Sequence, residues 1–398
     1  MPLHQPMSGR NPDEAHRAST PLELFVDLTF VVAVAQAASS LHHGLVEGHA
    51  GDALIGFPMA FFAIWWAWMN FTWFASAYDT DDALYRLAVF VQVGGVLILA
   101  AGIPRAFHGR DFTVITWGYV VMRLSLVGQW LRAAWSHPEG RSCALRYAVG
   151  ITVVQAGWVA RLALPSSLTL AGFVALAGAE LAVPVWAETA SRTSWHPGHI
   201  AERYGLFTII VLGESVLAAT VGVQVALDAD GTLGDLATVV VGGLVIVFSM
   251  WWLYFDMPAG EAVERARRAL TDRLTDAFTW GYGHYAVFSG AAAAGAGLAV
   301  AVDQATGHSR LTDLQAGFAL SVPVTIYVLA VWGLHFRHKA PSGLHTYGVP
   351  VAAAVILGSS ATPEPVLGTG AVLAVLAALG VALDRPQRSS HRGQVVPQ

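Results

Sequence analysis

The sequence predicts an all-α, polytopic integral membrane protein, a bundle of about twelve transmembrane helices. The 398-residue chain is 55% hydrophobic and only 12% charged, with a mean hydropathy of +0.53, whereas soluble domains carry about 25% charged residues. Its apolar residues fall into twelve segments, most of them near the roughly 20 residues that a helix needs to cross a bilayer. The 40 Gly and 14 Trp residues are typical of close helix packing and of membrane interfaces.

The expected helices follow one another with short connections. Residues 1–21 form a polar tail without an apolar core, so we expect no cleavable signal peptide. The eleventh helix is short and contains Pro350 and Gly358, and residues 384–398 form a polar, basic tail that we expect to be disordered. The expected helices cover residues 22–41, 53–75, 86–104, 112–134, 144–163, 168–187, 203–224, 233–255, 277–301, 313–334, 346–361 and 365–383.

The distribution of Lys and Arg predicts the orientation of the bundle. One side would hold both termini and the loops that follow even-numbered helices, and it carries 17 of the 22 Lys and Arg residues, against four on the other side. The remaining residue, Arg123, lies inside an expected helix. Because cytoplasmic segments are enriched in Lys and Arg, we expect a multi-pass protein of the inner (plasma) membrane with both termini in the cytoplasm.

A short pattern recurs in the two parts of the chain. An acid opens ELFVDLTF at 23–30 and ERYGLFTI at 202–209, and a Trp-rich helix follows each (WWAWMNF at 65–71, WWLYFD at 251–256). The repeat divides the bundle at 22–383 into halves at 22–187 and 203–383, each of six helices. Because six is an even number, the halves would be parallel, an arrangement that recurs in secondary transporters. The alternative is that two amphipathic helix starts are alike by chance.

These patterns resemble motifs of a known family. ELFVDLTF at 23–30 together with ERYGLFTIIVLGE at 202–214 is similar to the bacterial low temperature requirement A family, over about residues 20–385. The resemblance implies an integral membrane protein with a role in growth in the cold. It implies no particular molecular activity.

Glu214 is the strongest candidate functional residue. It lies in the middle of an apolar run that a Pro-Gly turn and the pair Glu202-Arg203 precede, about 18 Å along the helix from Glu202. A charged group at that depth costs roughly 2.5–3.5 kcal/mol, so Glu214 should face protein or water. Arg123 is the one basic residue inside an expected span, and we expect it to pair with Glu214 between the fourth and seventh helices. The pair is either a gated, proton-linked element or a static contact that fixes helix register.

A second group of candidates lies near the expected cytoplasmic ends of helices. Glu23 and Asp27 are four residues apart and therefore share one helix face. Glu23 either lies at a helix start favoured by the helix dipole or takes part in a pathway, and Asp27 lies deeper and favours a pathway or a buried contact. Glu202 and Arg203 either anchor the seventh helix or join the same pathway.

Glu180 and His284 complete the candidate pathway. With Glu23 and Asp27 they would line an inward-facing acidic vestibule, in which a histidine would suit a proton relay. For His284 the alternative is a single hydrogen bond in the core. His196, His199 and Glu202 have ligand-like chemistry, but Pro197-Gly198 interrupts the helix there, and we expect no metal and no cofactor.

The sequence leaves three classes of function open. The single Cys143 excludes an intrachain disulfide and a Cys-based zinc site, and no nucleotide-binding or hydrolase motif is present. We expect lipid, and a small ion or small molecule, as partners, and no nucleic acid. The favoured function is a secondary transporter or an ion or proton pathway through the candidate residues. The alternatives are a non-transporting sensor or envelope-adaptation protein and an intramembrane enzyme.

Overall fold

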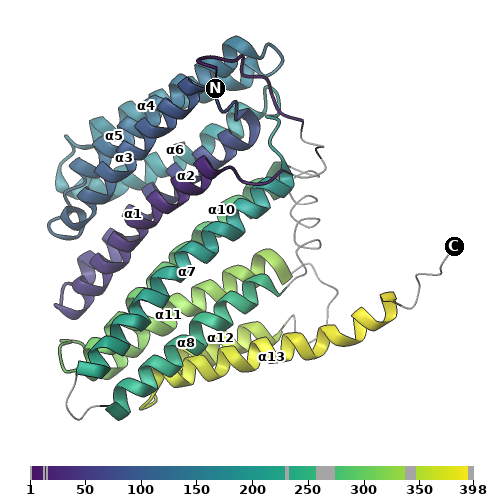
Figure 1. Cartoon of the computed structure of the whole chain (residues 1–398). Helices are drawn as coiled ribbons and strands as arrows, with labels where there is room; N and C mark the ends of the chain where they lie inside the picture. The colour runs from purple at the N-terminus through teal and green to yellow at the C-terminus, as the bar shows by residue number, and fades with distance from the viewer. Residues whose placement is uncertain are drawn as a thin grey trace. The chain divides into compact units, whose positions relative to one another are not determined.

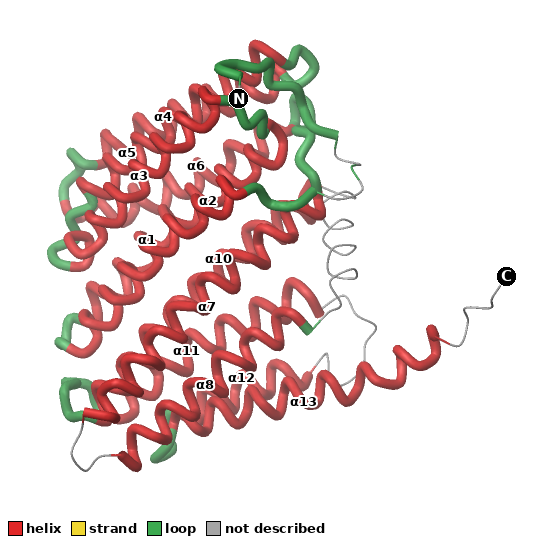
Figure 2. Tube along the Cα trace, viewed as in Figure 1, coloured by secondary structure: helices red, strands yellow, loops and turns green. Residues whose placement is uncertain are grey.

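The computed structural model describes residues 2–11, 14, 17–228, 233–256, 274–336 and 347–392. Within these ranges the chain forms helices joined by short loops, and no strand (Figures 1 and 2). The first six α-helices are α1 (Pro21–Val46), α2 (Ala50–Tyr78), α3 (Ala83–Phe107), α4 (Thr113–Ser136), α5 (Arg141–Arg161) and α6 (Thr169–Glu188). The other described α-helices are α7 (Pro197–Asp228), α8 (Leu233–Phe255), α10 (Leu274–Ala305), α11 (Asp313–Val331), α12 (Val349–Ser359) and α13 (Pro365–Arg392).

Each of the twelve expected apolar segments coincides with one of these helices, which confirms the all-α membrane bundle. Ten helices among the described residues are long and apolar enough to cross a membrane. Of the other two, α4 is 24 residues long but carries Arg123 and Gln129 among its buried residues. The eleventh expected segment, α12, has only 11 residues and is about 17 Å long, less than the roughly 30 Å thickness of a hydrocarbon core.

The C-terminal end differs from the prediction. The helix α13 continues to Arg392, so the expectation of a disordered tail from residue 384 is wrong for its first part, and residues 393–398 lie outside the described ranges. The Lys and Arg residues between 265 and 273 and between 337 and 339, which support the predicted orientation, also lie outside them.

The chain divides into two compact units, which we describe separately. Unit 1 comprises Met1–Ser40 and Gly51–Phe207, and unit 2 comprises Leu41–Ala50 and Thr208–Gln398. The first turns of α7 therefore belong to unit 1 and the remainder to unit 2. The predicted parallel halves follow a sequence pattern, and the repeat stays a prediction.

The core of unit 1 is built around α2. Trp65, Trp66 and Trp68 of this helix are among the largest fully buried side chains of the chain. Successive helices α3, α4, α5 and α6 pack against their neighbours in chain order. The closest approach joins α3 and α4, where a Cβ atom added to Gly118 would lie 2.7 Å from the carbonyl oxygen of Gly95. Only glycine permits this contact between the two backbones.

The helices α1 and α7 begin in the same way. Thr20 precedes Pro21 and forms a capping box with Glu23, in which each residue accepts a hydrogen bond from the backbone N–H of the other (2.8 and 3.2 Å). His196 precedes the first residue of α7, Pro197, and its Nδ1 accepts from the N–H of His199 at 3.0 Å. Proline suits the first helical position because its missing N–H has no intrahelical partner there. The caps fix where both helices start.

The core of unit 2 is built around α10, which packs against α11 and α8, while α13 packs against α8 and α12. Hydroxyl groups join the C-terminal helices: Ser321 and Ser360 lie 2.6 Å apart, and Ser359 and Thr369 lie 2.9 Å apart, oxygen to oxygen. Such polar contacts between helices are typical of membrane bundles. The last turns of α1 also belong to this unit, where His42 contacts Asp303 at 2.7 Å.

Candidate functional site

Unit 1 encloses a fully buried carboxylate, that of Glu180 in α6. We call this residue and the four side chains that donate hydrogen bonds to it the Glu180 cage. One carboxylate oxygen accepts hydrogen bonds from Tyr119 (2.9 Å) and Trp158 (3.1 Å), and the other accepts from Trp66 (2.8 Å). The second oxygen also accepts from the guanidinium of Arg123, which is only 1% exposed. Four donors thus surround one anion, so the cage leaves Glu180 little capacity for a further partner.

The predicted ion pair between Arg123 and Glu214 is therefore wrong, because the acidic partner of Arg123 is a different residue. Arg123 of α4 pairs with Glu180 of α6, and the aromatic residues around them exclude water from the pair. The predicted acidic vestibule of Glu180, Glu23 and Asp27 is also wrong for Glu180. Its carboxylate is enclosed by the four donors of the cage and does not line a shared space with the other two acids. Two further nitrogens of Arg123, Nε and Nη1, have no hydrogen-bond partner among the described residues.

A second buried cluster joins the starts of α1 and α7, and we call it the α1–α7 network. Glu23 lies 3.2 Å from Nε2 of His199, and Asp27 accepts from Arg203 at 2.5 Å and from Trp68 at 2.8 Å. All four ionisable side chains are 0–1% exposed. Each helix contributes residues four positions apart, which share one face, so two acids of α1 meet two bases of α7.

The α1–α7 network keeps unused hydrogen-bonding atoms, unlike the carboxylate of the Glu180 cage. Both hydrogen bonds to Asp27 reach the same oxygen, and the other oxygen, Oδ2, has no partner among the described residues. The same holds for Nε and Nη1 of Arg203 and for Nδ1 of His199. Native structures satisfy most buried polar atoms, so this cluster holds an unusual concentration of buried atoms that are open to a further hydrogen bond.

The chain before α1 extends this network toward the end of α2. Arg17 lies 3.6 Å from Glu23 and 3.7 Å from Asp79, measured between the guanidinium and the carboxylates. It also donates to the backbone carbonyl oxygens of Ala75 and Ser76. Burial, reinforced by the nearby charge of Glu23, raises the pKa of Asp79 to about 6, and burial lowers the pKa of Arg17. Asp79 therefore titrates close to neutral pH.

Glu202 has an anchoring contact. Its carboxylate accepts a hydrogen bond from the backbone N–H of Ser19 at 3.3 Å, which ties the start of α7 to the segment before α1. This agrees with the anchoring alternative that we held for Glu202. Its neighbour Arg203 belongs to the α1–α7 network instead.

Two predicted residues lie in unit 2. His284 is fully buried and both of its ring nitrogens are engaged, with Nδ1 2.7 Å from the carbonyl oxygen of Trp280 and Nε2 3.0 Å from the hydroxyl of Tyr254. A carbonyl only accepts, so Nδ1 carries the proton and His284 fits the alternative of a core histidine. Glu214 is half-buried and makes no hydrogen bond or ion pair with the residues that the structure describes.

The histidine before α7, His196, bonds to the backbone through both ring nitrogens. Nε2 of His196 lies 2.8 Å from the carbonyl oxygen of Glu14, and Nδ1 caps α7. Across the described part of the chain, no three His, Cys, Asp or Glu side chains are grouped so that they could hold one metal ion.

Sequence reasoning missed the tryptophans as hydrogen-bond donors to the buried acids. It treated the Trp-rich second helix as packing, yet Trp66 donates to Glu180 and Trp68 donates to Asp27. A signal was available, since Trp side chains at 66 and 68 lie in a helix that is buried over most of its length and each indole N–H needs an acceptor there. It also missed Arg17 and Asp79, which stand outside the apolar segments.

The comparisons with known proteins agree with this architecture. The family described as "Bacterial low temperature requirement A protein" matches residues 18–381. The chain is also similar to uncharacterized protein RA0937 of Rhizobium meliloti (strain 1021), with 26% identity over 396 residues that cover 94% of this chain and 91% of that protein. No solved structure matches. The family match includes both helix starts of the α1–α7 network, the whole Glu180 cage and most of unit 2: this chain belongs to the bacterial low temperature requirement A family.

Proposed function

We propose that this protein is a secondary transporter or ion pathway of the inner membrane, with both termini in the cytoplasm, and that the α1–α7 network is its proton-responsive element. The observation that carries the proposal is the pairing of Glu23 and Asp27 with His199 and Arg203, all buried, with hydrogen-bonding atoms left unused. Ionisable groups within membrane segments are costly and are functional by default.

The chemistry of the network suits proton uptake and release. A carboxylate beside an imidazole exchanges a proton over a short distance, and histidine is the side chain whose ordinary pKa lies nearest neutrality. Protonation of Glu23 would weaken its hold on His199 and Arg17, and protonation of Asp27 would release Arg203. Because these contacts join α1 to the start of α7, either change loosens one helix from the other, which is what a transport cycle requires.

The test is a flux assay on the purified full-length chain in liposomes. Proton flux under an imposed pH gradient or potential is followed with an internal pH dye for the wild type, Glu23→Gln and Asp27→Asn. We expect protein-dependent flux that both substitutions strongly reduce. Glu139→Gln is the matched control, because Glu139 is exposed in the loop between α4 and α5, and it should conduct like the wild type. Wild-type flux equal to that of empty liposomes under every gradient would overturn the proposal.

A second function is favoured by the Glu180 cage. A carboxylate closed by four donors and buried completely is suited to hold a fixed structure, as expected of a membrane sensor or scaffold that acts through lipids or partners. Folded protein without flux would favour this function. The orientation is tested separately with a reporter fused to the C-terminus, whose activity in the cytoplasm is the expected result.

A further inference from the structure

The buried charges at the starts of α1 and α7 belong to a larger cluster that includes Arg17 and Asp79. Arg17 joins its two parts, because the Nη2 atom lies 3.6 Å from Oε1 of Glu23 and 3.7 Å from Oδ2 of Asp79. Each side chain of the cluster is at most 5% exposed. We call this cluster the extended network, and its members are Arg17, Glu23, Asp27, Asp79, His199 and Arg203.

The charges of the extended network do not balance unless it holds a proton. It contains three acids and two arginines, and an arginine side chain keeps its positive charge. With every acid ionised and His199 neutral, one negative charge would be left over, which is costly in a buried site. One added proton makes the network neutral. The nearby charges outside it pair with each other, Arg10 with Glu14 at 3.1 Å and Arg86 with Asp81 at 2.7 Å.

The proton can occupy two positions that leave every charge with an opposite partner. In the first, Asp79 is protonated and Arg17 pairs with Glu23. In the second, Nε2 of His199 is protonated and pairs with Glu23 at 3.2 Å, while the ionised Asp79 pairs with Arg17. Glu23 lies between the two positions. Its Oε1 is within 3.6 Å of both Nη2 of Arg17 and Nε2 of His199, and it makes no hydrogen bond with the described residues.

Asp79 is the acid of the extended network that lies nearest to water. It directly follows α2, and its side chain is 5% exposed, against 0–1% for Glu23 and Asp27. Burial and the charge of Glu23 raise the pKa of Asp79 to about 6, so this carboxyl group gains and loses a proton near neutral pH. The charged and titratable groups that face it are Arg17, Glu23, Asp81, Tyr85 and Arg86.

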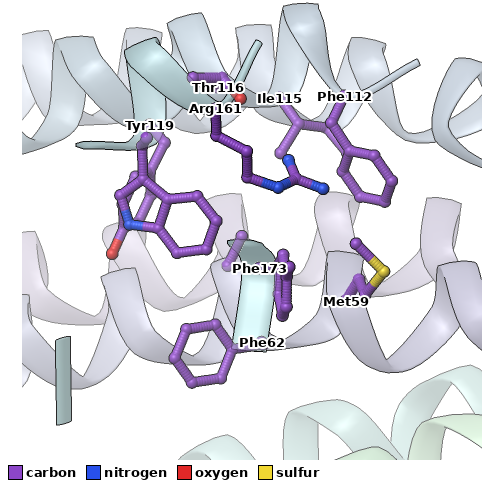
Figure 3. A pocket seen from close by; sticks show the side chains of 10 residues that line it. Met59, Phe62, Phe112, Ile115, Thr116, Tyr119, Arg161 and Phe173 are labelled. Carbon is purple, nitrogen blue, oxygen red and sulfur yellow. The ribbon is translucent and has the colours of Figure 1, made fainter. Parts of the chain in front are cut away.

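The Glu180 cage differs from the extended network in both respects. Glu180 and Arg123 form a neutral pair without an added proton. The pocket beside the cage has a volume of about 20 Å³, which is room for about one water molecule, and Figure 3 shows aromatic rings around it. Tyr119 and Trp158 form part of its wall and donate to Glu180. The exchangeable proton of unit 1 therefore belongs to the extended network.

We propose that Asp79 exchanges one proton between the extended network and the cytoplasm, and that His199 is the inner position of this proton. A hydronium ion transfers its proton to the Asp79 carboxylate and becomes water. The O–H bond of Asp79 then breaks, the proton passes by way of Oε1 of Glu23, and an N–H bond forms at Nε2 of His199. This proposal rests on the proposed function, which places this end of the bundle in the cytoplasm, and it adds a point of entry and a proton number of one.

The first experiment detects the proton at equilibrium and needs no flux. Infrared difference spectra of the purified full-length chain are recorded across pH 6, and the carboxylic acid C=O band that shifts in heavy water is followed. We expect the wild type to lose this band as the pH rises and Asp79→Asn to lack it. Asp81→Asn is the matched control, because Asp81 lies in the same loop with a side chain that is 54% exposed, and it should keep the band.

A further variant tests the inner position of the proton. His199→Gln removes that position, so the band of Asp79 should persist to a higher pH than in the wild type. An unchanged band in Asp79→Asn, or a band in His199→Gln that disappears at the same pH as in the wild type, would overturn the proposal.

The second experiment tests entry in the liposome flux assay. Asp79→Asn should reduce proton flux about tenfold or more and remove its dependence on pH near 6, whereas Asp79→Glu, which restores a carboxyl group, should keep both. Flux in the wild type that Asp79→Asn leaves unchanged would overturn the proposal and leave the proposed function intact. If the wild type conducts no protons, the proposed function fails, and loss of the band in Asp79→Asn still supports Asp79 as the proton site.

Discussion

Removing either partner of the Glu180 cage should destabilise the protein, and the structure predicts which removal costs more. Glu180→Gln replaces one carboxylate oxygen with an NH₂ group, so two of the four donors lose their acceptor and Arg123 stays buried without an anion. Arg123→Met removes one donor and leaves the carboxylate with three neutral ones. We therefore expect Glu180→Gln to be the more damaging change.

The magnitudes follow from the burial of the pair. Breaking a buried ion pair from one side costs about 3–5 kcal/mol, and each donor left without an acceptor adds about 1–3 kcal/mol. We expect a loss of about 3 kcal/mol for Arg123→Met and about 4 kcal/mol or more for Glu180→Gln. The double variant leaves no buried charge, so its loss should fall short of the sum of the two by about 2 kcal/mol.

The assay is equilibrium unfolding in mixed micelles with increasing SDS, followed by the fluorescence of the buried tryptophans. All four proteins of the cycle are measured with Glu139→Gln as the exposed control. Ordinary hydrogen bonds between transmembrane helices contribute only about 0.6 kcal/mol on average. Single losses below about 1 kcal/mol that simply add would refute the reasoning, because they would make the cage an ordinary polar contact.

Three other predictions concern unit 1. The pKa of Asp79 is raised to about 6 from the ordinary 3.8, so the folded state holds this proton more tightly; its contribution to stability is present below pH 3.8 and is lost as the pH rises through 6. Asp79→Asn should remove that slope from melting temperatures measured against pH, and an unchanged slope would contradict the assignment. Gly118→Ala should lower the melting temperature because its Cβ would meet the backbone of α3, whereas Gly128→Ala, with nothing within 4 Å, should be neutral or stabilising. Trp68→Phe should cost about 1–3 kcal/mol in the same unfolding assay by removing a donor from a buried carboxylate; no loss would show that ring packing alone matters there.

The helices were predictable because hydrocarbon thickness sets their length. Every expected apolar segment coincides with a helix, since backbone polar groups in lipid must be satisfied within the segment. Hydropathy also explains why the end of the last helix was predicted too early. It shows where the apolar region ends near residue 384, but a helix can continue past that point, and α13 continues to Arg392. Length therefore predicts where a span lies and predicts less well where its helix ends.

The partner of Arg123 was harder to predict because depth alone does not distinguish between acids. Glu180 and Glu214 both lie well inside their helices, and the expected segments 168–187 and 203–224 make Glu214 the more central of the two. Counted from the first residues of α4 and α6, Arg123 and Glu180 lie about 15 and 17 Å along their axes. Depth thus allowed Glu180 as well, and the deciding factor was the group of Tyr and Trp donors that only packing brings together.

In the α1–α7 network, the residues that align by sequence similarity are not the residues that are in contact. Similarity aligns like with like and sets Glu23 against Glu202, whereas contacts join Glu23 to His199 and Asp27 to Arg203, both at a separation of 176 residues. Two ionised acids that faced each other in a buried site would repel, whereas here the acids of α1 meet the bases of α7. The informative pattern was therefore the complementary spacing, acids four apart on one helix and bases four apart on the other. That spacing can be recognised in the sequence once the two helices are known to be neighbours, and the fold supplies this knowledge.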